Sequence, residues 1–318
     1  MTWDRGVHLP EQGLWLDPGV VKSLAFVSHA HQDHVRRHER ALLTPTTWRL
    51  VPPARRPRSA LLLETGGSTR LGGATVTLSP AGHMAGSALA LIEHDGARLL
   101  YTGDLRLRAP EGRTAIPAAD VLVVESTYGR PHFLFPEPAE VVEGIARWCR
   151  LALAAGVTPV LLGHALGKAQ ELMVRLAPYG FTFALDARCM PYADAHREMG
   201  LSLPDYVALD EDVEPGRVVI APPAGRASVR RLARRHRVAM VSGWALEETF
   251  WRRTGAEIAF PLSDHCDFQD LVEVCRLSGA SRVYTVHGFA EDLARHLRKR
   301  GVRACALAAA EQLDLGLA

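Results

Sequence analysis

The chain has 318 residues, of which 47% are hydrophobic, and a formal net charge of +2. This composition excludes a disordered protein. The small net charge excludes attraction of a polyanion by the whole molecule, so such binding requires a local patch or bound metal. The five cysteines include no CxxC pair, which predicts reduced thiols and a cytoplasmic location. We expect neither a signal peptide nor a membrane span.

The first third of the chain has the pattern of short strands separated by turns. Glycine pairs at 66–67 and 72–73 and Pro80 separate the apolar runs. The predicted strands are residues 24–28, 61–64, 74–79, 88–94, 98–101 and 121–125. This succession predicts β-rich structure with few helices.

The pattern changes after Gly129. Strands then alternate with helices, which predicts a parallel, doubly wound unit. The expected helices are residues 138–155 and 168–176, and the expected strands are 158–162, 218–221 and 238–241. The end of the chain adds strands at 258–262 and 282–286 and helices at 268–277 and 290–300.

The strongest chemical signal is HAHQDH at residues 29–34, directly after a predicted strand. Three imidazoles and a carboxylate within six residues are donors that zinc prefers. The alternative is a polar surface loop, which this density of ligand-type side chains disfavours. We expect the ligands to lie in a loop and at the start of a helix.

Two further residues stand at ends of predicted strands, and each offers a ligand-type side chain. His83 follows residues 74–79, and Asp104 follows residues 98–101. Either residue alone is more often structural or merely exposed. Together with the histidine motif, both become candidate metal ligands.

The order of these residues resembles the successive motifs of the metallo-β-lactamase fold. The motif residues are Asp17, His29, His31, Asp33, His34, His83 and Asp104. The resemblance implies an α/β fold, an αββα sandwich with the metals at one edge. It also implies that His29, His31 and His83 hold one zinc, that Asp33 and His34 hold the second, and that Asp104 bridges both. Asp17 is implied to orient the histidine loop, and we count both Asp17 and Asp33 among the catalytic residues.

Three later motifs resemble motifs A, B and C of the β-CASP nucleases. They are ESTYG at 125–129, LSDHCDF at 262–268 and VHG at 286–288. The resemblance implies a short, doubly wound cap domain between motifs A and B. The implied domains are 1–128 and 259–318 for the sandwich and 129–258 for the cap. His287 is implied to complete the second zinc shell, His265 to protonate the leaving oxygen, and Glu125 to orient His265. Without this context, both histidines are expected to be structural.

Two segments resemble the bacterial DNA-ligase-associated exonucleases. They are GHALGKAQ at 163–170 and SGW at 242–244. The resemblance implies a zinc-dependent DNA exonuclease in repair, with metal-bound hydroxide as the attacking group and with Mn or Mg as other activating metals. The implied partners are DNA and, functionally, an ATP-dependent DNA ligase and a helicase. The alternative is a ribonuclease of the RNase J or 3′-end-processing type, because a histidine in motif C is typical of RNA processors.

Four side chains are candidates for contact with the substrate. They are Lys168, Ser126, Arg230 and Arg234. Lys168 follows a glycine-bearing loop at a predicted helix start, which can bind an anion, although an ordinary turn has the same pattern. Arg230 and Arg234 are four residues apart and share a helix face, which can follow a phosphate backbone or simply face solvent.

Two other function classes remain open. One is a β-CASP scaffold without catalysis, whose usual mark is degenerate ligands, and none of the motif residues is missing here. The other is a small-molecule hydrolase of the lactamase or glyoxalase type. Such enzymes lack the Glu125, His265 and His287 set and the cap.

Overall fold

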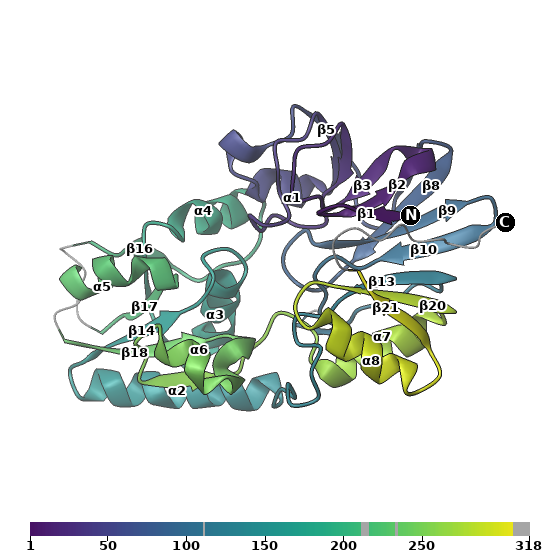
Figure 1. Cartoon of the computed structure of the whole chain (residues 1–318). Coiled ribbons are helices and arrows are strands. Elements are labelled where there is room, and N and C mark those ends of the chain that lie inside the picture. The colour runs from purple at the N-terminus through teal and green to yellow at the C-terminus, as the bar shows by residue number, and fades with distance from the viewer. Residues whose placement is uncertain (111, 211–215, 233–234, 308–318) are drawn as a thin grey trace. The chain divides into compact units, whose positions relative to one another are not determined.

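The computed structural model describes residues 1–110, 112–210, 216–232 and 235–307 of a mixed α/β protein (Figure 1). The chain forms two compact units. The first unit combines Met1–Leu134 with His265–Ala318, and the inserted unit is Phe135–Asp264. Domain boundaries at residues 128 and 258 stay predictions, because compactness alone does not define a folding domain.

A six-stranded sheet opens the first unit, in the order β1-β2-β3-β4-β5-β6. The three N-terminal strands pair antiparallel, and the pairs from β3 to β6 are parallel. Its strands are β1 (Thr2–Trp3), β2 (Val7–Leu9), β3 (Leu14–Leu16), β4 (Leu24–Phe26), β5 (Arg40–Leu43) and β6 (Ser59–Leu62). Helix α1 (Pro45–Leu50) follows β5 and begins where the Thr44 hydroxyl accepts a hydrogen bond from the Thr47 amide.

A seven-stranded sheet forms the second layer of the first unit, in the order β21-β20-β13-β10-β9-β8-β7. Its strands are β7 (Ser68–Leu71), β8 (Ala74–Pro80), β9 (Ala88–His94), β10 (Ala97–Tyr101), β13 (Val121–Glu125), β20 (Arg282–Val286) and β21 (Arg303–Ala306). A short hairpin of β11 (Arg108–Ala109) and β12 (Gly112–Arg113) lies outside it. Strands β13, β20 and β21 pair in parallel, so the last two strands of the described chain join the sheet built by the first 125 residues.

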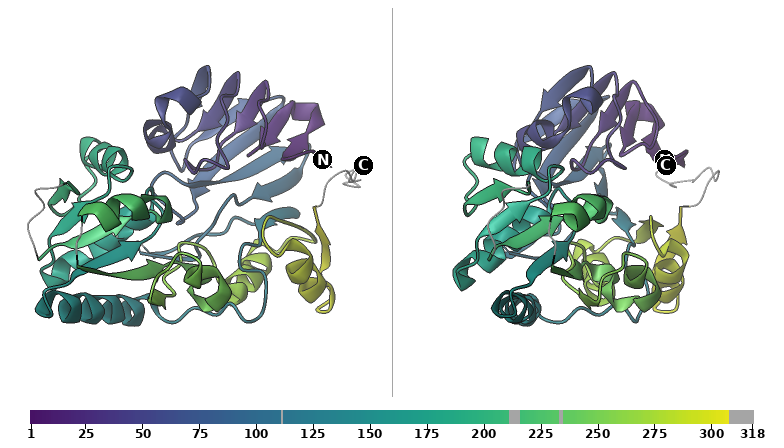
Figure 2. Two further views of the ribbon diagram at one scale, coloured as in Figure 1. Left: turned by 60° about the vertical axis from the view of Figure 1, so that its left-hand side comes forward. Right: turned by 90° about the vertical axis from the view of Figure 1, so that its left-hand side faces the viewer.

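The two sheets of the first unit enclose a shared apolar core. Phe26 and Leu42 from the six-stranded sheet belong to the same buried cluster as Leu78, Ala90 and Val123 from the seven-stranded sheet. Figure 2 shows the two sets of strands as adjacent layers. On the other face of the seven-stranded sheet, helices α7 (Phe268–Ser278) and α8 (Ala290–Arg298) form a second core. Burying a leucine or phenylalanine in such cores stabilises the fold by about 1.5–3 kcal/mol each.

The inserted unit contains one sheet of six strands in the order β16-β15-β17-β14-β18-β19, all paired in parallel. The strands are β14 (Thr158–Leu162), β15 (Phe183–Leu185), β16 (Tyr206–Ala208), β17 (Val218–Ala221), β18 (His236–Val241) and β19 (Ile258–Phe260). Helices α2 (Pro138–Ala154), α3 (Lys168–Leu176) and α4 (Met190–Glu198) contribute to one core, and α5 (Arg226–Leu232) and α6 (Glu248–Arg252) to the other. The inserted unit therefore has helices on both faces of a parallel sheet.

Two observations concern the whole described chain. Its cysteines are free thiols, and burial raises the pKa of Cys149 and Cys189 to about 12. Within the described residues, every helix is too short or too polar to cross a bilayer.

Candidate metal centre

The ligand-type side chains predicted from the sequence converge at strand ends of the first unit. Asp17 directly follows β3, and the histidine loop follows β4 after two residues. His83, Asp104 and His287 follow β8, β10 and β20. The convergence joins residues that are far apart in sequence, because the late strand β20 pairs with β13.

The first group consists of His29, His31, His83 and Asp104, whose ligand atoms all lie within 4.8 Å of one another. The Asp104 Oδ2 atom lies 3.5 Å from His29 Nε2 and 3.8 Å from His83 Nε2. The His83 Nε2 atom lies 3.2 Å from His31 Nδ1. Three imidazoles and one carboxylate at this spacing can surround a single cation.

A second group shares Asp104 with the first. His34 Nε2 lies 3.5 Å from Asp104 Oδ2 and 3.6 Å from Asp33 Oδ2. The rings of His34 and His287 have centroids 5.5 Å apart. Asp33 has 81% of its side chain exposed, and His287 is also exposed, so this side of the centre faces solvent.

The first group fits a cation on the chemistry of its donors. The His29 ring is fully buried, and its Nε2 atom has no hydrogen-bond partner among the described residues. Its Nδ1 atom lies 3.0 Å from Ser28 Oγ. Burying an unsatisfied nitrogen costs on the order of 1–3 kcal/mol, and a cation bound to Nε2 removes this cost.

The buried charges are arranged around Asp104. Burial of the His34 ring opposes its charged form, but Asp104 and Asp17 outweigh it and raise the pKa of His34 to about 10. Burial and the neighbouring His34 hold the pKa of His29 well below its usual value. Burial alone would raise the pKa of Asp104, but His34 and His29 lower it well below its usual range. Without metal, the centre therefore keeps Asp104 ionised and His29 neutral, which are the states that bind metal, whereas His34 has to release a proton to become a ligand.

Asp17 holds the histidine loop through hydrogen bonds to Ser28 and a contact with His34. Its carboxylate accepts hydrogen bonds from the Ser28 amide at 2.8 Å, the Ser28 hydroxyl at 2.5 Å and the Tyr101 hydroxyl at 3.0 Å. It also lies 3.0 Å from His34 Nδ1. This contact places the Nδ1 proton of His34 toward Asp17, so Nε2 is the nitrogen that faces Asp104. The sequence did not identify Tyr101 or Ser28, and their only signal is their position at the same strand ends.

His265 and Glu125 form a pair beside the first group. The His265 Nδ1 atom lies 3.0 Å from each carboxylate oxygen of Glu125. Glu125 is buried and accepts a 2.6 Å hydrogen bond from the Leu105 amide, which fixes the carboxylate. The His265 and His83 rings have centroids 4.5 Å apart. Ligand atoms of Asp104, Glu125 and His265 also lie within 4.8 Å of one another, so the pair adjoins Asp104.

Ser126 is buried behind His287. Its hydroxyl lies within hydrogen-bond distance of two backbone oxygens, 2.8 Å from Val286 and 2.7 Å from His287. His287 has φ of +62°, a conformation that side-chain-bearing residues rarely adopt. A substrate contact by Ser126 stays a prediction. In the structure its hydroxyl contacts the backbone at the bend that contains His287.

The loop from residue 29 to 38 does not begin a helix, so that part of the sequence prediction is wrong. Residues 32–34 form a turn, and the backbone then runs irregularly to β5. The Arg36 guanidinium donates hydrogen bonds to the carbonyls of Gln32 at 2.7 Å and Val35 at 2.8 Å. These carbonyls are the acceptors that a helix would use for its own amides.

The remaining candidates belong to the inserted unit. Lys168 is 2% exposed, and its ammonium lies 2.5 Å from Glu171 Oε2 and 3.8 Å from Asp264 Oδ1. Arg230 is exposed on α5. Arg234 lies outside the described residues. Substrate contact by these residues stays a prediction, and for Lys168 the structure shows an internal ion pair.

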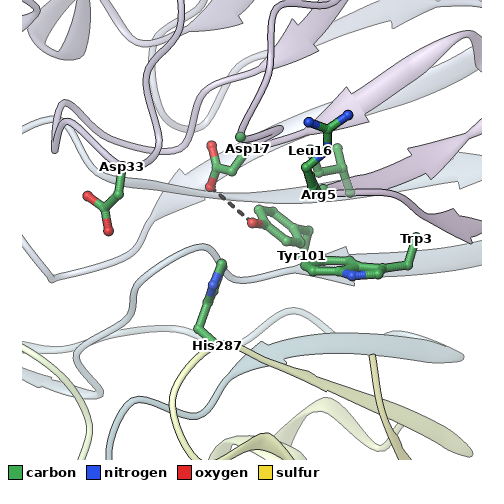
Figure 3. Close-up of a pocket in the computed structure, with 9 residues that line it drawn as sticks. Trp3, Arg5, Leu16, Asp17, Asp33, Tyr101 and His287 are labelled. Atoms are coloured by element: carbon green, nitrogen blue, oxygen red, sulfur yellow. Dashed lines mark hydrogen bonds between the residues drawn. The ribbon is translucent and has the colours of Figure 1, made fainter. Parts of the chain in front are cut away.

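A cavity of about 180 Å³ in the first unit adjoins the second group. Asp33, Asp17 and His287 line it, together with Tyr101 and Trp3 (Figure 3). The sequence interpretation did not identify Trp3, because one tryptophan in a two-residue strand has no recognisable pattern.

Comparisons with known proteins identify relatives in sequence and a similar solved structure. No profile of a described protein family matches the chain. A probable DNA ligase of Opitutus terrae is 40% identical over the whole chain, which covers 32% of that protein. An RNase J-like protein of Methanocaldococcus jannaschii is 35% identical over 31% of this chain and 24% of its own length. The chain thus spans only about a quarter to a third of these relatives. A crystal structure of an Enterococcus faecalis protein of unknown function matches with a TM-score of 0.53 and 16% sequence identity. The match covers 85% of this chain and 76% of that one, and it shows similarity of fold alone.

Proposed function

We propose that this chain, a homologue of the β-CASP nucleases with the metallo-β-lactamase fold, is a two-zinc exonuclease that hydrolyses phosphodiester bonds of DNA in repair. The observation that carries the proposal is the position of Asp104 Oδ2, which lies within 3.8 Å of nitrogens from His29, His34 and His83. Asp104 is close to histidines of both ligand groups, and two neighbouring cations are commonly held by a carboxylate that both groups share.

The fold that we propose follows from the two units. Two packed sheets with α7 and α8 on one outer face support the αββα sandwich of the first unit. The parallel sheet of the inserted unit supports a β-CASP cap of about residues 129–258.

His29, His31 and His83 would hold the first cation, Asp33, His34 and His287 would hold the second, and Asp104 would contribute to both. Zinc is the metal we favour, because imidazole nitrogens with a few carboxylate oxygens suit it better than they suit magnesium. When bound, the metals would lower the pKa of water for attack and neutralise charge on the phosphate.

The protein's own part in the reaction centres on His265. Glu125 lies 3.0 Å from Nδ1 of His265, so we assign to Nε2 the proton that goes to the departing oxygen. An alkoxide is a poor leaving group, and a positioned acid accelerates its departure by about 10²–10⁴-fold. Asp17 keeps Nε2 of His34 directed at Asp104 throughout.

The preference for DNA rests on the relative named as a probable DNA ligase, which matches along the whole chain. The same match supports a functional association with a ligase, and a helicase stays part of the proposal. A ribonuclease is the second candidate, because the archaeal relative is named RNase J-like and because His287 occupies motif C.

The test is metal analysis joined to hydrolysis of end-labelled substrates. DNA and RNA of one sequence, each with a 5′-phosphate or a 5′-hydroxyl, are incubated with protein loaded with Zn, Mn or Mg. We expect about two metals per chain and release of mononucleotides from DNA faster than from RNA. Faster cleavage of RNA would select the second candidate. Metal binding without hydrolysis of either polymer would refute a nuclease.

A further inference from the structure

We infer that the cavity lined by Trp3 is a subsite for the nucleobase next to the scissile phosphate, with the Trp3 indole as its stacking platform. This inference rests on the proposed function. It adds a substrate contact contributed by the N-terminal strands of the first unit.

The cavity is joined to the candidate centre through shared residues. Asp33 and His287 line it, and both are proposed ligands of the second cation. A phosphate bound to that cation therefore lies at the cavity, and the nucleoside attached to the phosphate is the nearest group that can enter it. In Figure 3, Asp33 and Trp3 lie at opposite ends of the labelled residues, with Tyr101 between them.

The chemistry of the lining favours a neutral ring. The carboxylates of Asp17 and Asp33 disfavour an anion there, and Asp17 is already engaged by Ser28, His34 and Tyr101. The volume of about 180 Å³ is below the range of pockets for drug-sized ligands, roughly 300 Å³ upward, and suits one ring system. An indole face offers stacking to any base, because every base has a π-face.

The backbone fixes Trp3 relative to the candidate centre. The turn after β1 docks on the segment that follows Asp17, where the Gly19 amide donates a 2.6 Å hydrogen bond to the Arg5 carbonyl. A Cβ at Gly6 would lie 2.6 Å from Pro18 Cα, so only glycine permits this approach. Trp3 is half-buried and packs against the core between the sheets. Trp3 thus belongs to a hairpin whose turn is held against the segment that follows Asp17.

Arg5 also lines the cavity, but we do not assign the contact to it. Its side chain is 69% exposed beside Asp4, and in Figure 3 its guanidinium points away from His287.

The experiment compares Trp3→Ala and Trp3→Phe with a matched control, Trp15→Ala. Trp15 lies in β3 of the same sheet, stacks on His8 with centroids 4.0 Å apart, and has Lys22 3.3 Å from its ring centroid, outside the cavity. Each zinc-loaded protein, with His265→Ala added to suppress hydrolysis, is titrated by fluorescence anisotropy with DNA oligonucleotides that have normal ends, or an abasic residue at the 5′ or the 3′ end. Hydrolysis of the same oligonucleotides is measured separately with the proteins that retain His265.

The readout is the dissociation constant for the abasic oligonucleotide divided by that for the normal oligonucleotide, measured with one protein sample. An unfolded fraction of the protein changes both constants equally, so this ratio does not depend on it. For wild type we expect a ratio of roughly 5 to 140 at one of the two ends, from the usual strength of base stacking. Trp3→Ala should bring that ratio close to 1, Trp3→Phe should restore most of it, and Trp15→Ala should leave it unchanged. A wild-type ratio near 1 at both ends, or a ratio that survives Trp3→Ala, overturns the subsite. Base-dependent binding without hydrolysis would refute the nuclease and leave the subsite standing.

Discussion

Asp104 carries the contacts that make the candidate centre a single site. Its carboxylate lies between the His29 and His34 nitrogens at 3.5 Å each, and both rings are buried. Asp17 stabilises the same loop from the opposite side of His34. At the scale of single residues, substitutions should distinguish two roles: the charge of Asp104 in binding metal and the proton of His265 in the reaction.

Replacing Asp104 by asparagine keeps the shape and removes the charge. We expect Asp104→Asn to lose metal and to lower hydrolysis by more than about 100-fold, because even outer contacts of metal ligands contribute roughly 10–100-fold. Elemental analysis and turnover on labelled DNA measure both effects. Asp120→Asn is the matched control, since Asp120 pairs with Arg98 away from the centre. Full metal content in Asp104→Asn would exclude Asp104 as a shared ligand.

His265→Ala should keep the metal content and lower turnover by about 10²–10⁴-fold, since it removes an acid and not a ligand. A phosphodiester with a 4-nitrophenolate leaving group needs little protonation, so the same variant should lose far less activity on it. His94→Ala, in β9, serves as control. Loss of zinc from His265→Ala would contradict the proposed role and make His265 a ligand.

At the scale of elements, the sequence predicts strands that lie in clear apolar runs. Residues 88–94, 121–125 and 158–162 are predicted with the bounds of β9, β13 and β14. Strands β1 and β2 are missed, whereas the equally short β4 and β19 are predicted because the apolar run continues beyond each strand.

The candidate site was predictable to the extent that its ligands are clustered. The histidine motif is local, so it is visible in the sequence alone. Hydrogen-bond partners that the fold brings together are not visible in the sequence, and Tyr101, which donates to Asp17, is one of them. Burial is equally invisible, so the internal ion pair of Lys168 could not be foreseen. The helix start expected at the histidine motif is absent, and the Arg36 side chain, whose position the sequence does not give, takes the carbonyl of Gln32 as its acceptor.

The segment between the histidine loop and β5 contains a buried histidine whose titration should affect stability. His38 is fully buried, its Nδ1 accepts a hydrogen bond from the Lys22 amide, and burial lowers its pKa to about 4. An unfolded histidine has a pKa of about 6.5, so the unfolded chain binds the extra proton between pH 6.5 and 4. The free energy of unfolding should therefore fall as the pH falls through this window, by on the order of 3 kcal/mol from His38.

Urea unfolding of metal-free wild type and His38→Gln at pH 4 to 7 measures this contribution. Glutamine retains an acceptor for the Lys22 amide but does not titrate. We expect the unfolding free energy of the variant to fall less steeply below pH 6.5. Parallel curves for the two proteins would show that His38 does not bear this proton linkage.

At the scale of the whole molecule, the proposed ligands all belong to the first unit, and the inserted unit has apolar cores of its own. A ligand that binds only the folded form stabilises it by about 2.7 kcal/mol at a hundredfold excess over its dissociation constant. Zinc should therefore raise the melting temperature of the first unit.

Calorimetry with zinc and with a chelator, combined with hydrogen exchange, tests this by locating the protected segments. We expect added protection in β4, β10 and β20 and none in β14 and β17. Asp104→Asn should show neither the melting shift nor the added protection. Equal protection of β14 and β17 would mean that the two units unfold as one.

The pairing of β13 with β20 also has a consequence for synthesis of the chain. Val121 pairs with Arg282, which follows it by 161 positions. At about 5–20 residues per second, a ribosome needs roughly 8–30 s to supply the missing neighbour. During that interval β13 is the edge strand of the nascent sheet. Its five residues, which are buried in the folded chain, are then exposed and can pair with strands of other chains. Ribosome-bound chains stopped before residue 282 should therefore be the aggregation-prone and chaperone-dependent form of this protein, and the full-length chain after release from the ribosome should not.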